Sequence, residues 1–170
     1  MGAQSSSVSI GKMHLEQESL KTIPDLRSMV VTVNINTIAR RIFEALTVPE
    51  YQETWLSMPG HDERSYIAAT RIGQSYRLNR HGHSGIDVSV AGAYQVFRRN
   101  KLHFTWQEFG VSSTSESVVQ IRLHGDFGRT SVHLIHRGPF SAEEYERHQE
   151  MWTASLQKLT SLLQGSHRPQ

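Results

Sequence analysis

The sequence contains no cysteine. This absence excludes disulfide bonds, thiolate zinc sites, iron–sulfur ligation and a cysteine nucleophile, and it fits the cytoplasmic location that we expect. Long apolar runs are also missing, since none reaches the ~18 residues that a membrane helix needs. The N-terminus lacks the basic start and following apolar run of a signal peptide, so we expect no signal peptide. The formal net charge is only +2, which argues against a nucleic-acid partner. We therefore expect neither a membrane span nor nucleic-acid binding.

Hydrophobic residues make up 37% of the 170 residues, enough for one domain with a single core. The first 27 residues differ from the rest, because a small polar serine run is followed by a break at Ile23-Pro24-Asp25. We predict a flexible N-terminal tail over residues 1–27, one domain over residues 28–165 and a C-terminal tail over residues 166–170.

Hydrophobic spacing predicts a strand, two short helices and then a run of strands. Alternation over residues 29–37 indicates a strand with one buried side, and four-residue spacing over residues 38–46 indicates a helix. A capping-box spacing that starts at Thr47, with Pro49 in the first turn, predicts a second helix to about Trp55. Six more strands with short turns between them are expected at 64–72, 74–80, 86–97, 101–107, 115–124 and 129–137.

The C-terminal region predicts one long helix. Ser141 and Glu144 have capping-box spacing, helix-forming residues continue to Gln164, and Gly165 supplies the stop. Sequential strands with short turns imply an antiparallel meander, and a half-apolar sheet and a one-sided helix bury each other's apolar faces. The predicted fold class is α+β, with a sheet of about seven strands packed on the long helix.

Four segments resemble a known family in their order and residues. They are IFEALTVPE at 42–50 followed by Trp55, LHFTW at 102–106, GRT at 128–130 followed by Val132, Leu134 and HRG at 136–138, and the helix residues His148, Trp152 and Leu156. Together these segments resemble the helix-grip fold of the START-like (SRPBCC) superfamily, in the branch named for the activator of the heat-shock-protein-90 ATPase homologue.

The resemblance implies a curved sheet that grips the long helix, with a cavity between them. In the superfamily such cavities hold lipids, sterols, polyketides, hormones or other apolar molecules, and a few members are aromatases or cyclases. We therefore expect a small apolar or amphipathic ligand and no cofactor. Two alternatives stay open: an interaction module with the heat-shock chaperone as its partner, and a cyclase- or hydrolase-type enzyme in the same cavity. An exposed edge strand would also allow a homodimer.

Candidate ligand-binding residues follow from the faces on which large side chains fall. Trp106 and His136 share strand faces with apolar residues, and the helix face that should oppose them carries His148 and Trp152. Large rings give broad apolar contact, and an indole N–H or an imidazole can orient the polar end of a ligand. The predicted ligand-binding set is Trp55, Arg77, Tyr94, Phe104, Trp106, His136, His148 and Trp152.

The sequence carries no catalytic motif, so we assign no catalytic residue. Alternation along the strand at 74–80 does not decide whether Arg77 or the preceding tyrosine points inward. An enzyme would need at least two groups such as Arg77, Tyr94 and His136 to converge in the cavity. The loop at 81–87 contains two histidines and an aspartate, but nothing nearby completes a metal shell, and we predict no metal site.

Overall fold

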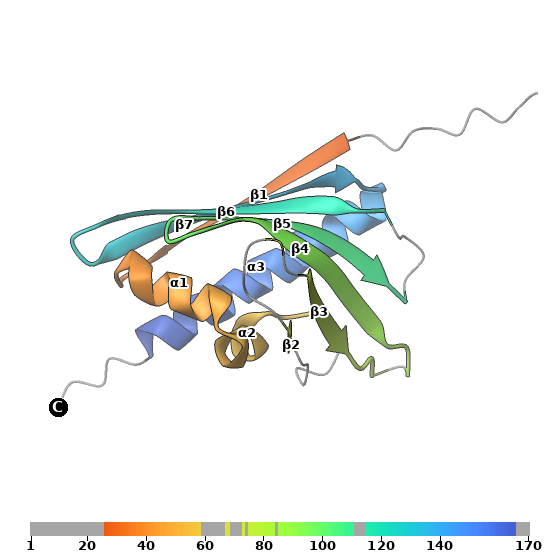
Figure 1. Cartoon of the computed structure of the whole chain (residues 1–170), viewed down its shortest axis with the longest axis horizontal. Helices are drawn as coiled ribbons and strands as arrows, with labels where there is room; N and C mark the ends of the chain where they lie inside the picture. Colours follow the sequence, from red (N-terminus) through yellow and green to blue (C-terminus); the bar gives the residue numbers. More distant parts are fainter. Residues whose placement is uncertain are drawn as a thin grey trace, which may run out of the picture.

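One antiparallel sheet of seven strands forms the body of the molecule, in the spatial order β1-β7-β6-β5-β4-β3-β2. This computed structural model describes residues 26–58, 67–68, 73, 75–83, 85–110 and 115–165. The strands are β1 Leu26–Ile35, β2 Ile67–Ala68, β3 Ser75–Arg80, β4 Val88–Arg98, β5 Lys101–Phe109, β6 Ser117–Asp126 and β7 Arg129–Pro139. Strands β2 to β7 follow one another as the meander that the short turns predicted, and β1 pairs with β7 at the edge of the sheet (Figure 1).

Three helices lie on the same side of the sheet, which curves over them (Figure 1). They are α1 Ala39–Thr47, α2 Pro49–Trp55 and α3 Ala142–Gln164. The predicted capping box of α3 is present, since the Glu144 N–H donates to Ser141 Oγ at 3.1 Å and the Ser141 N–H donates to Glu144 Oε2 at 2.7 Å. None of the helices in the described part of the chain combines the length and the apolar character that a membrane crossing requires.

The start of α2 differs from the prediction. Thr47 is the last residue of α1, and its hydroxyl donates to the Phe43 carbonyl at 2.7 Å instead of capping α2. Val48 is the N-cap of α2 and makes no side-chain cap bond. Pro49 occupies the first turn, where a missing N–H costs nothing, so proline rather than a capping side chain favours this start.

The start of β1 also differs from the prediction, and the strand expected at 64–72 is described only in part. Within the strand expected at 64–72 only Ile67–Ala68 are described, and they pair with β3. The rest of that stretch lies outside the described residues, as do the tail residues 1–25 and 166–170. Strand β1 begins at Leu26, inside the predicted tail, because its first residues extend the ladder with β7 as far as Pro139.

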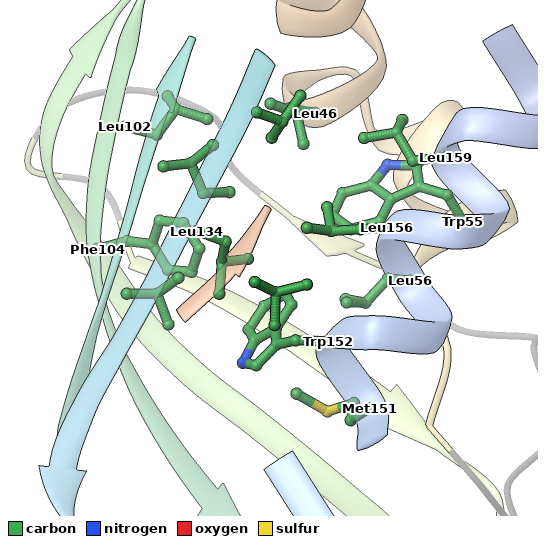
Figure 2. Packing of buried hydrophobic residues seen from close by; sticks show 14 of the residues in the cluster. Leu46, Trp55, Leu56, Leu102, Phe104, Leu134, Met151, Trp152, Leu156 and Leu159 are labelled. Atoms are coloured by element: carbon green, nitrogen blue, oxygen red, sulfur yellow. The ribbon is translucent and has the colours of Figure 1, made fainter. Parts of the chain in front are cut away.

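The core lies between the inner face of the sheet and the helices. Strand β7 alternates strictly, with Val132, Leu134 and His136 buried on the inner face. The buried residues of α3 that meet this face are His148, Met151, Trp152, Ser155, Leu156, Leu159 and Leu163. Figure 2 shows Trp152 and Leu156 of α3 directed toward the sheet. The helix therefore runs under the sheet as the one-sided pattern predicted.

Candidate functional site

A small cavity lies among the sheet, α2 and α3. Its volume is about 30 Å³, which is room for one or two waters. It is lined by Leu46, Gln52, Trp55, Leu56, Tyr76, Leu78, Tyr94, Leu102, Phe104, Trp106, Ile121 and Trp152. Figure 2 shows part of this lining, with Trp152 reaching from α3 toward the sheet that carries Phe104.

Three rings from neighbouring strands form the sheet side of the cavity. The Tyr94 and Phe104 ring centroids are 5.3 Å apart, and the Tyr76 centroid lies 5.7 Å from Tyr94 and 5.9 Å from Phe104. A Cβ at Gly92 would lie 2.8 Å from the Tyr76 ring, so only glycine leaves room for this ring. The Tyr76 hydroxyl donates to the Thr105 carbonyl at 2.7 Å. Tyr76 therefore offers the cavity its ring and not a free hydroxyl.

The three tryptophans that line the cavity all have their indole N–H bonded within the protein. Trp55 Nε1 donates to a backbone carbonyl of α1 at 2.7 Å. Trp106 Nε1 donates to Glu108 Oε1 at 3.1 Å, and Trp152 Nε1 donates to His136 Nδ1 at 2.9 Å. None of these donors is free to orient a ligand, contrary to the expectation from sequence. The indoles supply the cavity with apolar surface only.

The polar groups that face the cavity are Gln52 and Tyr94. Gln52 is 6% exposed, and its Nε2 donates to the Leu46 carbonyl at 2.6 Å and lies 3.5 Å from the Tyr94 hydroxyl oxygen. Gln52 Oε1 is buried and has no partner within the described part of the chain. Burial raises the pKa of Tyr94 to about 12, against the Gln52 contact, so its hydroxyl stays protonated. An acceptor and a donor thus lie side by side in an otherwise apolar cavity.

A polar cluster lies beside the two indoles, toward the first turns of α3. We define it as Glu108, Ser117, His136, Arg147 and His148, and it is largely buried between β5, β6, β7 and α3. The ring centroids of His136 and His148 are 4.8 Å apart. The cluster connects the sheet to the helix through charged and hydrogen-bonded groups.

His136 is fully buried and fully bonded. Its Nδ1 accepts from Trp152, so its Nε2 carries the proton and donates to Ser117 Oγ at 2.8 Å. Ser117 Oγ in turn donates to the Trp106 carbonyl at 2.9 Å. Burial lowers the pKa of His136 well below its usual value, and the nearby charge of His148 acts in the same direction. His136 is therefore a neutral structural link and not a free acid or base.

Glu108 is the centre of the cluster. Its Oε1 accepts from His148 Nε2 at 2.7 Å and from Trp106, and its Oε2 accepts from Arg147 Nη1 at 2.7 Å. Burial would raise the pKa of Glu108, but the bond and charge of His148, the charge of Arg147 and the Trp106 donor together lower it to about 2. His148 Nδ1 is buried without a partner among the described residues, beside a hollow of about 10 Å³. Such a hollow is at the lower limit for one water.

Five of the eight predicted site residues line the cavity: Trp55, Tyr94, Phe104, Trp106 and Trp152. His136 and His148 belong to the polar cluster and do not line the cavity. Arg77 is exposed on the outer face, 6.0 Å from the Phe109 ring, because β3 alternates and turns its neighbour Tyr76 inward. The groups that an enzyme was expected to bring together, Arg77, His136 and Tyr94, do not converge.

Sequence reasoning missed Gln52 and Glu108. Glu108 lies two residues after Trp106, so strand alternation alone places both on the inner face, and this signal was available. Gln52 sits in a seven-residue helix with no clear apolar face, and nothing in its sequence context marks it as buried.

The histidine loop before β4 forms a surface pair. His81 Nδ1 lies 3.1 Å from Asp87 Oδ1, and both side chains are mostly exposed. Among the described residues no group of three histidine, cysteine or acidic side chains could hold a metal ion.

The sequence model of one protein family matches most of the domain. The family is described as Activator of Hsp90 ATPase homolog 1-like protein, and the match covers residues 36–164. No curated protein matches the chain.

Solved structures with the same fold share little sequence with the chain. Protein CV1439 from Chromobacterium violaceum has a TM-score of 0.70 at 17% identity over 80% of this chain and 96% of its own. The AHSA1 protein of Silicibacter pomeroyi has a TM-score of 0.68 at 21% identity over 83% of this chain and all of its own. Protein MLL2253 from Mesorhizobium loti has a TM-score of 0.67 at 19% identity over 84% and 100%. These likenesses show the fold.

Proposed function

Because the chain belongs to the Activator of Hsp90 ATPase homolog 1-like family, in the START-like superfamily, we propose that it binds a small apolar or amphipathic molecule between the sheet and α3. The observation that carries the proposal is the buried, unpartnered Gln52 Oε1 in an aromatic cavity. A buried acceptor without a partner costs free energy, and a ligand donor would remove that cost.

Gln52 and Tyr94 determine which polar group the ligand should carry. This pair offers one acceptor and one hydroxyl donor, and none of the described residues that line the cavity is charged. A neutral group that both donates and accepts, such as an alcohol, a phenol or an amide, matches this pair. The remainder of the ligand would be held by burial of apolar area, at roughly 25 cal/mol per Å².

The lining must move to admit such a ligand. A cavity of about 30 Å³ is far below the roughly 300–1,000 Å³ of pockets that hold drug-sized molecules. We place the movement in α2, which is seven residues long and is linked to α3 through the Ser57 N–H and Ser155 Oγ at 2.9 Å. Outward motion of α2 would carry Gln52 and Trp55 with it and enlarge the cavity.

The three tryptophans provide the test, because they are all the tryptophans of the chain and all line the cavity. We expect N-phenyl-1-naphthylamine, a neutral apolar amine, to quench their fluorescence saturably. Ile121→Phe would fill the cavity and weaken the response about tenfold, whereas Leu163→Phe, in the core but outside the lining, would leave it unchanged. Unfolding curves establish that both variants are folded.

Two results would count against binding in this cavity. The first is a wild-type protein that shows no saturable quenching, and the second is equal quenching of both variants. Native mass spectrometry of the protein from its own host would then decide what to pursue. A co-purifying small molecule would direct the search to another site, and a clean apo mass would favour the interaction module.

A further inference from the structure

The outer face of the sheet carries a row of basic side chains that crosses four strands. Arg98 of β4 pairs with Lys101 of β5, Lys101 with Arg122 of β6, and Arg122 with His133 of β7. Side chains alternate along each strand, and the adjacent residues Leu102 and Ile121 are buried on the inner face. The four basic side chains therefore point outward. Neighbouring strands lie about 4.8 Å apart, and the row is therefore close to continuous.

Within the part of the chain that the structure describes, no carboxylate neutralises this row. Among the side chains that the structure describes, none at an outward position of β4, β5, β6 or β7 is acidic. Within the same residues, Arg98, Lys101 and Arg122 form no ion pair. The helices lie on the opposite side of the sheet (Figure 1). They carry exposed carboxylates. The net charge of the chain is small, but several of its basic side chains are concentrated on the outer face of the sheet.

An open hollow adjoins the row at the end of the β6–β7 hairpin. It has a volume of about 510 Å³ and is lined by Asn34, His124, Gly125, Arg129 and Ser131. An arginine beside amide, hydroxyl and imidazole groups suits a phosphate or carboxylate oxygen.

Phe127 lies at the tip of the same hairpin and contributes no buried surface to the folded protein. Its side chain is fully exposed, at 104%. Phe127 and Gly128 have φ of 42° and 87°, as the two central residues of a type I′ turn require. Asparagine, aspartate or glycine is preferred at the first of these positions, and a bulky residue there is strained. Phe127 therefore costs the fold both strain and exposure, and a partner that buries its ring would account for it.

We propose that the basic row, the hollow and Phe127 form a docking surface for an anionic phospholipid membrane. A broad sheet face suits a flat layer of charge, the hollow would take a lipid headgroup, and Phe127 would enter the interfacial region. The exposed Phe127 ring favours a membrane over other polyanions, because an apolar ring can be buried at the boundary between lipid headgroups and acyl chains. The membrane is bound at its surface and is not crossed.

The test is co-sedimentation of the full chain with vesicles. We expect binding to phosphatidylcholine vesicles that contain about 30 mol% phosphatidylserine, weak binding to phosphatidylcholine alone, and release as salt rises. Each basic side chain near the surface contributes about fivefold, so Lys101→Gln and Arg122→Gln should each weaken binding about fivefold and together about 25-fold. Arg40→Gln is the matched control, since Arg40 is an exposed arginine of α1 on the helix side.

Phe127→Asn separates docking from folding. Asparagine suits the turn, so this variant should be at least as stable as the wild type while it binds vesicles about fivefold more weakly. The proposal is overturned if the wild type ignores phosphatidylserine or binds both vesicles equally, or if the row variants and Arg40→Gln behave alike. Binding of polyglutamate or duplex DNA without vesicle binding would assign the face to another polyanion and would also overturn it.

Discussion

Two neighbouring regions between the sheet and the helices, the polar cluster and the cavity, are built differently. Toward the start of α3, the polar cluster buries a carboxylate, two histidines and a serine, and nearly every polar atom has a partner. On the α2 side of Trp152, the cavity is lined by rings and leucines, and its buried amide Gln52 has an oxygen without a partner among the described residues. The sheet thus contacts α3 through bonded charge in the polar cluster, whereas it faces α2 across a mostly apolar cavity.

The polar cluster and the cavity contribute differently to stability and to binding. A satisfied polar network holds the helix in one register, and removing a member leaves its partners buried and unpaired. An unsatisfied group in a cavity does the reverse, because it costs stability until a ligand meets it. We assign orientation of α3 to the polar cluster and ligand recognition to the cavity.

The contrast is tested most severely at Glu108. Glu108→Ala leaves His148, Arg147 and the Trp106 N–H without their acceptor, and we expect a loss of about 3–5 kcal/mol in the free energy of unfolding. Because the folded pKa of about 2 lies below the ordinary 4.5, this stabilisation is present above pH 4.5 and is lost as the pH falls toward 2. Urea unfolding at several pH values measures both effects.

The control for Glu108 is Glu150→Ala, which removes an exposed carboxylate of α3. We expect it to change the free energy of unfolding by less than about 0.5 kcal/mol. Equal losses for the two variants would mean that the polar cluster does not hold the helix.

A smaller loss is expected at His136. His136→Phe keeps a ring at this position but leaves the Trp152 N–H without its acceptor and removes the donor to Ser117 Oγ, at a cost of about 2–4 kcal/mol near pH 7.5. The pKa of His136 in the folded protein lies below 6.5, so the unfolded chain binds this proton at a higher pH than the folded protein does. The wild type therefore loses the stabilisation by neutral His136 as the pH falls below 6.5, and the variant, which lacks the imidazole, does not. The gap between the two proteins should therefore narrow in acid, by up to about 1.4 kcal/mol per pH unit.

Glu108 and His148 face this position in both proteins, so the comparison isolates the contribution of His136. Chemical unfolding between pH 5 and 8 provides the measurement, with His83→Phe in the exposed loop as control. A gap that widens in acid would contradict a neutral His136.

The smallest effect on stability is expected in the cavity, at Gln52. Gln52→Met keeps the length of the side chain, removes the unpaired oxygen and gives up the bond to the Leu46 carbonyl. These changes oppose each other, and we expect the free energy of unfolding to stay within about 1 kcal/mol of the wild type. Affinity for a hydroxyl-bearing ligand should fall about tenfold, which a tryptophan titration measures. A loss of several kcal/mol in the free energy of unfolding with unchanged affinity would mean that Gln52 stabilises the fold and does not recognise a ligand.

Much of this architecture follows from periodicity in the sequence. Alternation along β5 and β7 placed Trp106 and His136 inward, and helical spacing placed His148 and Trp152 opposite them. The capping box at Ser141 marked the start of α3 correctly. These signals are local and strong, because a side chain on the wrong face of a strand or helix would lose its burial.

The functional detail depends on contacts that periodicity does not report. Alternation in β3 left Tyr76 and Arg77 undecided, because the register against β4 and the space above Gly92 select the tyrosine. Whether an indole N–H is free depends on a partner elsewhere, such as Glu108 for Trp106. The basic row is still less visible, since its members are spread along the chain and only the pairing of four strands lines them up.

The opposite charge of the two sides of the molecule gives it a permanent electric dipole across the sheet. Among the described residues, the outer face of the sheet carries arginines that form no ion pair, whereas the helices carry more carboxylates than basic side chains. At low ionic strength such a dipole turns the protein before contact, so that any charged surface meets a preferred side first. It also makes the sheet of one copy attract the helices of another. Added salt, which shortens the screening distance to about 10 Å at 0.1 M, therefore keeps the protein in solution instead of driving it out.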